Sequence, residues 1–151
     1  MIDYQALKKQ ILFKDMNDDE LRKIAGIIER VQARQGEVLF QEEDRTKGLW
    51  LIKSGKVQIS KMAGDGWRQT LVVLGAGHFF GELAIIENRQ HVSRAEAVED
   101  SELLLLPKDK FEKLVSEDCE LALNFFKSMV VALSQNLRRM NDKFLSVLIS
   151  Y

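Results

Sequence analysis

The chain has 151 residues, 46% of them hydrophobic, which is enough for one domain with a full core and a helical extension. Its 22 basic and 23 acidic side chains give a formal net charge of −1, which excludes a broad positive field that would draw it to nucleic acid or to an anionic membrane. Cys119 is the single cysteine, so the chain cannot build an internal disulfide framework or a cysteine-based zinc site.

The N-terminal region lacks the signature of a targeting segment. Its first ten residues, MIDYQALKKQ, do not show the basic-then-apolar pattern of a signal peptide. The longest uninterrupted apolar run, residues 103–106, is far too short to cross a bilayer. Together with the single cysteine, which suits a reducing compartment, these features predict a cytoplasmic protein with no membrane partner.

The next segment predicts helices. Asn17 is followed three residues later by Glu20, which is the spacing of a capping box. Residues 11–13 predict an earlier short helix on the same core. Apolar residues after the cap recur at helical spacing and predict one helix with an inward stripe of Leu21, Ile24, Ile27, Ile28 and Val31.

From residue 31 the pattern changes to short strands separated by turns that contain glycine. The turns are expected at residues 35–36, 54–55 and 63–66. Many short strands at this spacing predict an all-β barrel, roll or sandwich rather than alternating βαβ units. The runs rich in β-branched and aromatic residues lie at 37–40, 49–52, 56–60, 69–74 and 103–106.

A helical pattern returns after Pro107. Residues 108–115 predict a short helix, and a long one follows. Its apolar residues are spaced alternately four and three apart, as in the seam of a coiled coil, at Phe126, Val130, Leu133, Leu137, Met140, Phe144, Val147 and Tyr151. We favour a homodimer through residues 126–151 over packing of this seam on the chain's own domain. A second stripe is suited to holding the helix to that domain: Leu121, Phe125, Met129 and Ala132.

The stretch from residue 75 to 97, GAGHFFGELAIIENRQHVSRAEA, carries the strongest functional signal. Three glycines surround two phenylalanines, and Glu82 follows Gly81 directly before an apolar run, which predicts a short helical turn. Backbone amides exposed at the start of such a turn attract anions, phosphate above all. The stretch therefore predicts a small phosphorylated ligand held by the backbone, with the Glu82 carboxylate accepting a hydrogen bond from a sugar hydroxyl.

The ordered motifs of this chain resemble those of the cyclic nucleotide-binding domain family over about residues 13–144. They are GEVLF at 36–40, GLWLI at 48–52, GKV at 55–57, GxGxFFGELA at 75–84 and AxxDSxL at 97–103, ending at Phe111. The resemblance implies a mainly β fold with flanking helices. That fold is a double-stranded β-helix or β-roll, jelly-roll-like, with N-terminal helices and a long C-terminal helix.

The resemblance also implies a ligand site in which backbone amides around Gly81 to Ala84 contact a cyclic phosphate and Glu82 accepts the ribose 2′-hydroxyl. The family's arginine, nine or ten residues after the glutamate, falls on His91 when Ala97 is aligned with the family's alanine. A neutral imidazole offers one donor and no full charge, so affinity for a cyclic nucleotide is expected to fall ~100-fold or more. The implied ligand-binding residues are Phe80, Gly81, Glu82, Leu83, Ala84, Arg89, His91, Val92 and Ser93.

Three interpretations of this departure stay open. Arg89, two residues before His91, replaces the missing charge, and is better placed than Arg94, which would face away on an extended strand. Alternatively His91 itself makes a pH-dependent phosphate contact. In the third interpretation the pocket is degenerate and serves as an interaction scaffold, which we rank equal to ligand binding. A smaller departure is Glu43, where the family often has glycine before an acidic residue, here Asp44.

We expect a non-enzymatic, stand-alone sensor or regulatory module that holds cyclic AMP or cyclic GMP in residues 75–97 and signals through its C-terminal helix. No Ser-His-acid or Cys-His spacing suggests a nucleophile. In the family the C-terminal helix also closes over the base. Residues 1–115 are therefore expected to form the β-roll with its N-terminal helices, and residues 116–151 a dimerisation and lid element. The interpretation leaves room for a protein partner.

Two other functions are less favoured. A minimal cupin-like metal site would use His78, Glu82 and His91, but position 80 is Phe80 where a cupin usually has a second histidine, so we expect no metal and no cofactor. Direct DNA binding is not expected either. The basic residues of the C-terminal helix lie beside its apolar seam, and the sequence stops at Tyr151 without a helix-turn-helix.

Overall fold

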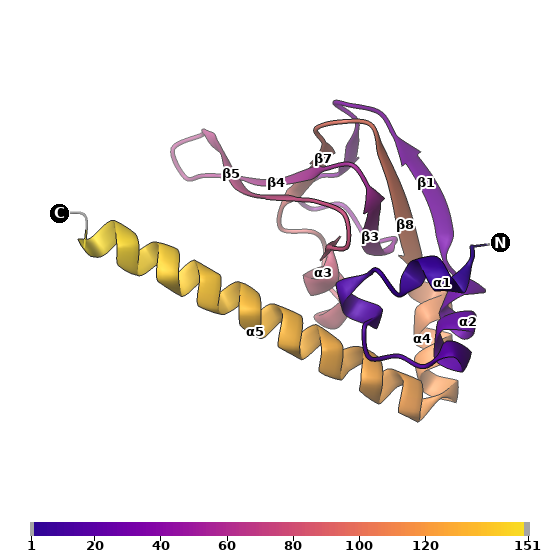
Figure 1. Cartoon of the computed structure of the whole chain (residues 1–151). Helices are drawn as coiled ribbons and strands as arrows, with labels where there is room; N and C mark the ends of the chain where they lie inside the picture. Colours follow the sequence, from indigo (N-terminus) through magenta and orange to yellow (C-terminus); the bar gives the residue numbers. More distant parts are fainter. Residues whose placement is uncertain (1, 150–151) are drawn as a thin grey trace.

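Two four-stranded antiparallel sheets form the β-domain (Figure 1), in a computed structural model that describes residues 2–149 apart from the side chain of Ala84. The first sheet has the order β1-β8-β3-β6 and contains β1 (Glu29–Ala33), β3 (Gly48–Ser54), β6 (Phe79–Phe80) and β8 (Ser101–Pro107). The second has the order β2-β7-β4-β5 and contains β2 (Val38–Phe40), β4 (Val57–Met62), β5 (Arg68–Leu74) and β7 (Arg94–Ala97). This architecture confirms the predicted β-roll with flanking helices.

The core lies in two layers, one on each side of the first sheet. On β8, Leu103 and Leu105 face the space between the two sheets, whereas Leu104 and Leu106 face the helices. Successive side chains of a strand point to opposite faces, so a strand buried on both sides needs a continuous apolar run. This explains why residues 103–106 are all leucine and why they gave such a clear strand signal.

The N-terminal helices cover the outer face of the first sheet: α1 (Tyr4–Leu7), the 3₁₀ turn η1 (Ile11–Phe13) and α2 (Asp18–Ala25). The predicted capping box is confirmed, since the Glu20 amide donates to Asn17 Oδ1 at 2.9 Å and the Asn17 amide donates to Glu20 Oε1 at 3.1 Å.

The predicted length of this helix is wrong, because α2 ends at Ala25 and β1 begins at Glu29. Gly26 forms the C-cap, and Val31 pairs across the sheet with Leu103 instead of extending the helical stripe. β-branched residues such as Val31 favour strands, and that preference prevails once a sheet neighbour is present. The strands β1, β6 and β7 were not among the predicted runs.

Two helices follow the β-domain, α4 (Lys108–Glu117) and α5 (Cys119–Ile149). The base of α5 is part of the core, because the predicted second stripe is buried: Leu121, Phe125, Met129 and Ala132. Phe125 packs against Phe13, with ring centroids 6.3 Å apart, and against Phe111 at 4.6 Å. Hydrogen bonds of 3.0 and 3.2 Å from the Asn124 amide to the Glu20 carboxylate add a polar contact to α2.

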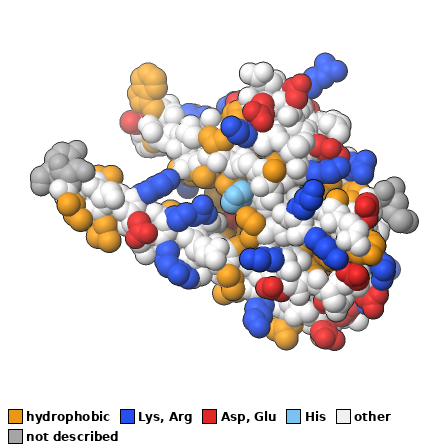
Figure 2. Space-filling view, in the orientation of Figure 1, with side chains coloured by type: hydrophobic (Ala, Val, Ile, Leu, Met, Phe, Trp, Pro, Cys, Tyr) orange, Lys and Arg blue, Asp and Glu red, His pale blue; other side chains and the backbone are white. Residues whose placement is uncertain are grey.

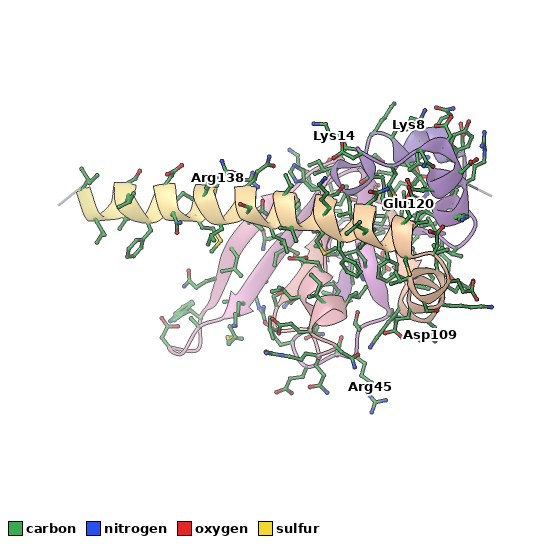
Figure 3. The ribbon with its side chains drawn as sticks, turned by 90° about the horizontal axis from the view of Figure 1, so that it is seen from below. Lys8, Lys14, Arg45, Asp109, Glu120 and Arg138 are labelled. Atoms are coloured by element: carbon green, nitrogen blue, oxygen red, sulfur yellow. The ribbon has the colours of Figure 1, made fainter. Side chains whose placement is uncertain are left out.

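The distal half of α5 extends away from the body of the molecule (Figures 1 and 3). Its apolar seam is exposed there, and Figure 2 shows hydrophobic side chains on this extension. The exposed seam residues in this half are Leu137, Met140, Phe144 and Val147, while Tyr151 lies outside the described residues. Within residues 2–149 no helix combines the length and the apolar character needed to span a membrane.

Candidate functional site

A tight turn after β6 leads into the short helix α3 (Glu82–Ile86), which confirms the predicted helical turn. Gly81 caps α3 in the left-handed conformation, with φ 79°. A Cβ on Gly81 would come to 3.4 Å from Trp50 Cδ1 and 3.5 Å from His91 Cε1. Both distances are ordinary van der Waals contacts, so glycine is favoured here by the left-handed backbone conformation.

The two phenylalanines before the turn fix its position. Phe79 packs in the core layer under the helices, and Phe80 packs in the layer between the sheets. The Phe80 ring is parallel to Trp50, with centroids 6.0 Å apart, and tilted against Phe40 at 5.9 Å. Phe80 is thus buried beside the turn, and Trp50 and Phe40 pack against its ring.

Glu82 is the first residue of α3 and its side chain is half-buried. Burial raises the pKa of this carboxyl, while a hydrogen bond from its own backbone amide acts in the opposite direction. No other described residue donates to the carboxylate. A partly desolvated carboxylate without a donor gains free energy when a ligand hydroxyl supplies one. Leu83 beside it is exposed, and the backbone of Ala84 continues the helix.

The His91 ring is buried and stacks on Phe40, with centroids 3.6 Å apart and an interplanar angle of 8°. Burial lowers the pKa of His91, and the nearby Asp44 charge only partly opposes this. The neutral imidazole is therefore favoured in the folded protein near pH 7. His91 brings no full positive charge to the turn.

Neither nearby arginine is unpaired. Arg89 is exposed and forms an ion pair with Glu87 at 3.0 Å. Arg94 lies on β7 and pairs with Glu96 at 2.9 Å, on the sheet face opposite to Ala95, which is in the core. Of the remaining predicted site residues, Val92 is exposed and Ser93 is half-buried in the segment before β7.

The structure therefore brings only part of the predicted set together. Phe80, Gly81 and His91 meet around Trp50, whereas Arg89 is directed to an exposed ion pair. Among residues 2–149, no three His, Cys, Asp or Glu side chains gather so that they could hold a metal ion.

No prediction from the sequence included the loop between β2 and β3 in the candidate site. A cavity of about 200 Å³ opens beside His91, with the buried rings of Phe40 and Trp50 and the exposed charged residues of this loop in its lining: Asp44, Arg45 and Lys47. The available signal was Glu43, which replaces the family's glycine and adopts a positive φ of 73°. The charged residues that follow this turn line the cavity together with His91.

A second cavity, of about 260 Å³, is mostly apolar and lies beneath α3. Ile85 and Ile86 of α3, Phe111 and Val115 of α4 and Phe126 of α5 are in its lining. α3 therefore meets the two helices that follow the β-domain around one space.

The chain is similar to known proteins in both its sequence and its fold. A family model described as cyclic nucleotide-binding domain matches residues 30–118. The chain is 31% identical over 109 residues to the cyclic AMP receptor protein of Thermus thermophilus, covering 72% of this chain and 50% of that protein.

Two solved structures are also similar. A cyclic nucleotide-binding domain from Methylobacillus flagellatus superposes with a TM-score of 0.86 at 21% identity, covering 94% of this chain and 84% of that one. The regulatory domain of protein kinase A from Toxoplasma gondii, crystallised with cyclic AMP, has a TM-score of 0.67 and 25% identity over 73% of this chain and 42% of that one. The chain spans about half the length of the curated relatives it matches first.

Proposed function

This chain belongs to the cyclic nucleotide-binding domain family, and on that premise we propose that it is a regulatory module that binds cyclic AMP or cyclic GMP at the Gly81–Glu82 turn. The observation that carries the proposal is the Glu82 carboxylate, half-buried behind a left-handed glycine and without a donor from any described side chain. A ribose hydroxyl is the donor that such a site lacks. Backbone amides at the start of α3 then face the phosphate.

The relatives support a regulatory role. One is named a cyclic AMP receptor protein, another an anaerobic regulatory protein, and a third is a kinase regulatory domain crystallised with cyclic AMP. We propose that this chain shares the non-enzymatic role of these regulators.

We propose that ligand binding is transmitted to α5 through α4. The first residue of α4, Lys108, contacts both sides of the site, because its amide donates to the Lys47 carbonyl at 3.0 Å and its ammonium group donates to Asn88 Oδ1. A shift of α3 also changes the apolar cavity that it shares with Phe111 and Phe126. If the ligand binds more tightly when α5 is in one of two positions, its binding would shift the population of molecules toward that position.

The output element in this proposal is a homodimer through α5. The distal half of α5 exposes a heptad seam that no other element within residues 2–149 covers, which is the pattern of a parallel helix pair. We propose that residues 1–115 form the ligand-binding unit and residues 116–151 the dimerisation and lid element. The buried base of α5, from Leu121 to Ala132, joins these two units.

Isothermal titration calorimetry with cyclic AMP and cyclic GMP at pH 6 and pH 7.5 tests the ligand. We expect binding by the wild-type protein and at least a tenfold loss in Glu82→Ala, because a charge-assisted hydrogen bond is removed. Glu99→Ala is the matched control, since Glu99 is an exposed glutamate in the turn before β8 and should leave affinity unchanged. Wild-type protein that binds neither nucleotide at millimolar concentration would contradict the proposal.

The second candidate is a dimerisation domain with a degenerate pocket. It is favoured by the neutral, stacked His91 and by the ion pair that occupies Arg89, so neither of these two residues offers a free cation to the turn. Light scattering coupled to size-exclusion chromatography separates the candidates when read beside calorimetry. A dimer that Leu137→Glu converts to monomer, with no nucleotide binding in either protein, supports this second function.

A further inference from the structure

The loop between β2 and β3 is fastened directly to His91. The Glu43 amide donates to the His91 carbonyl at 2.8 Å, and the His91 amide donates to the Asp44 carbonyl at 2.9 Å. These two backbone hydrogen bonds hold the loop against His91, the residue that stands where the family has arginine. Loop and histidine therefore form one structural unit.

The loop is a built turn. The Gln41 amide donates to Asp44 Oδ2 at 2.9 Å, and the Asp44 amide donates to the Gln41 carbonyl at 3.2 Å. Arg68 on β5 grips the adjacent Glu42 through two hydrogen bonds of 2.7 and 3.1 Å. Glu43 keeps a positive φ between these anchors, and a non-glycine residue in that conformation is strained. Such strain persists only where its surroundings hold it, often at a functional site.

Arg45 and Lys47 are the cations that this turn presents. Both are in the lining of the cavity beside His91, and within residues 2–149 neither takes part in an ion pair. Figure 3 shows the Arg45 side chain extending outward from the loop, away from the body of the molecule. Asp44, the carboxylate in the same lining, uses one oxygen to close the turn.

The other cations close to the site are engaged. Arg89 pairs with Glu87, Arg94 pairs with Glu96, and Arg68 pairs with Glu42. His91 is neutral near pH 7 because its ring is buried. The cavity also borders the ligand turn, since Gly81 lies against its Trp50 and His91 walls.

We propose that Arg45 and Lys47, from outside residues 75–97, supply the positive charge that neutralises a phosphate group bound beside His91. The inference rests on the proposed function in taking that phosphate to belong to a cyclic nucleotide. Two flexible side chains at the mouth of a cavity bind less rigidly than one bidentate guanidinium, so the resulting affinity depends strongly on salt. The site is accordingly expected to bind a phosphate group with its highest affinity at low ionic strength.

Calorimetry with cyclic AMP at 50 mM and 200 mM salt tests the inference, using Arg45→Gln, Lys47→Gln and the double variant. Each single change is expected to weaken binding about tenfold at 50 mM salt, and the double variant is expected to lose most of the salt dependence. Lys113→Gln is the matched control, because Lys113 is an exposed, unpaired lysine on α4 away from the cavity. Unchanged affinity in the double variant, with binding still lost in Glu82→Ala, overturns the inference and leaves the proposed function intact.

A titration with inorganic phosphate makes the inference testable apart from the nucleotide. Amide resonances of Glu43 and His91 in wild-type protein should shift with added phosphate, and those of the double variant should not. Phosphate-dependent shifts without nucleotide binding would support the anion site and reject the proposed function. If the shifts are the same in wild-type and double-variant protein, Arg45 and Lys47 do not form the site.

Discussion

Replacing Glu82 by glutamine should stabilise the free protein and weaken ligand binding at the same time. Glutamine keeps the size of the side chain and its capacity to accept a hydrogen bond, but removes the charge. In the structure this charge is half-buried, and the only hydrogen bond to its carboxylate from the described residues comes from its own amide. The substitution therefore removes the desolvation cost of the charge, which destabilises the unbound protein. It also removes the charged acceptor of the ligand's hydrogen bond, which stabilises the complex.

Both magnitudes follow from that environment. An incompletely compensated, half-buried carboxylate costs about 1 kcal/mol, which corresponds to a rise in melting temperature of about 2–4 °C for a chain of this size. A hydrogen bond from a ligand hydroxyl to a charged carboxylate contributes about 1.5–3 kcal/mol. Its loss weakens binding by about 10- to 100-fold.

The pH dependence of the stability difference identifies the carboxyl group. Burial raises the folded-state pKa of Glu82 above its ordinary value of 4.5, so the folded protein holds this proton to higher pH than the unfolded chain does. Below pH 4.5 the group is protonated in both states and the variant gains nothing. As pH rises through 4.5 the unfolded chain ionises first, so wild-type stability falls relative to the variant until the folded-state pKa is passed.

Urea unfolding of both proteins between pH 4 and pH 8, together with calorimetry, provides the assay. Glu99→Gln is the control for removing an exposed negative charge. A destabilised Glu82→Gln at pH 7, or a stability difference that does not change between pH 4 and pH 7, would refute the reasoning about burial. Unweakened nucleotide binding would refute the assigned role of the carboxylate.

Four further substitutions test other parts of the structure by denaturant unfolding. Glu43→Gly should stabilise the folded protein by up to about 1 kcal/mol, because glycine adopts the positive φ without strain. Gly36→Ala, at φ 88° with open space around it, should destabilise the protein by about the same amount. Equal effects of the same sign would contradict the strain at Glu43. His91→Phe should flatten the loss of stability below pH 6.5, where the unfolded histidine takes up a proton before the buried one; an unchanged slope would show that His91 is not the group responsible. Phe125→Ala should cost about 3–5 kcal/mol, and a loss below 1 kcal/mol would mean that α5 is not anchored through this ring.

The features predicted well from the sequence are those with local causes. The capping box of Asn17 and the double-faced leucine strand each depend on a few neighbouring residues. The strand β1 was missed because its apolar residues continue a helical period, and only pairing with β8 reveals them as a strand. β6 has two residues, too few for any alternation to appear.

The site divides in the same way. Gly81 and Glu82 were predicted because one turn contains both the conformation and the carboxylate. Arg45 and Lys47, the cations that we propose for the phosphate, were not predicted from the sequence. They lie more than forty residues before His91, and the hydrogen bonds that join their loop to His91 form only in the folded chain. Arg89 looked suitable by spacing, but its neighbour Glu87 engages it.

The free half of α5 also has a geometric consequence. Its last buried contact is Ala132, and the chain runs on to Ile149, which at about 1.5 Å per residue is roughly 25 Å beyond that contact. The helix thus works as a lever whose fulcrum is the aromatic cluster around Phe125. A tilt of about 10° at that fulcrum would carry the far end, roughly 36 Å away, through roughly 6 Å, so a small repacking beside the Gly81–Glu82 turn would become a displacement as large as a side chain.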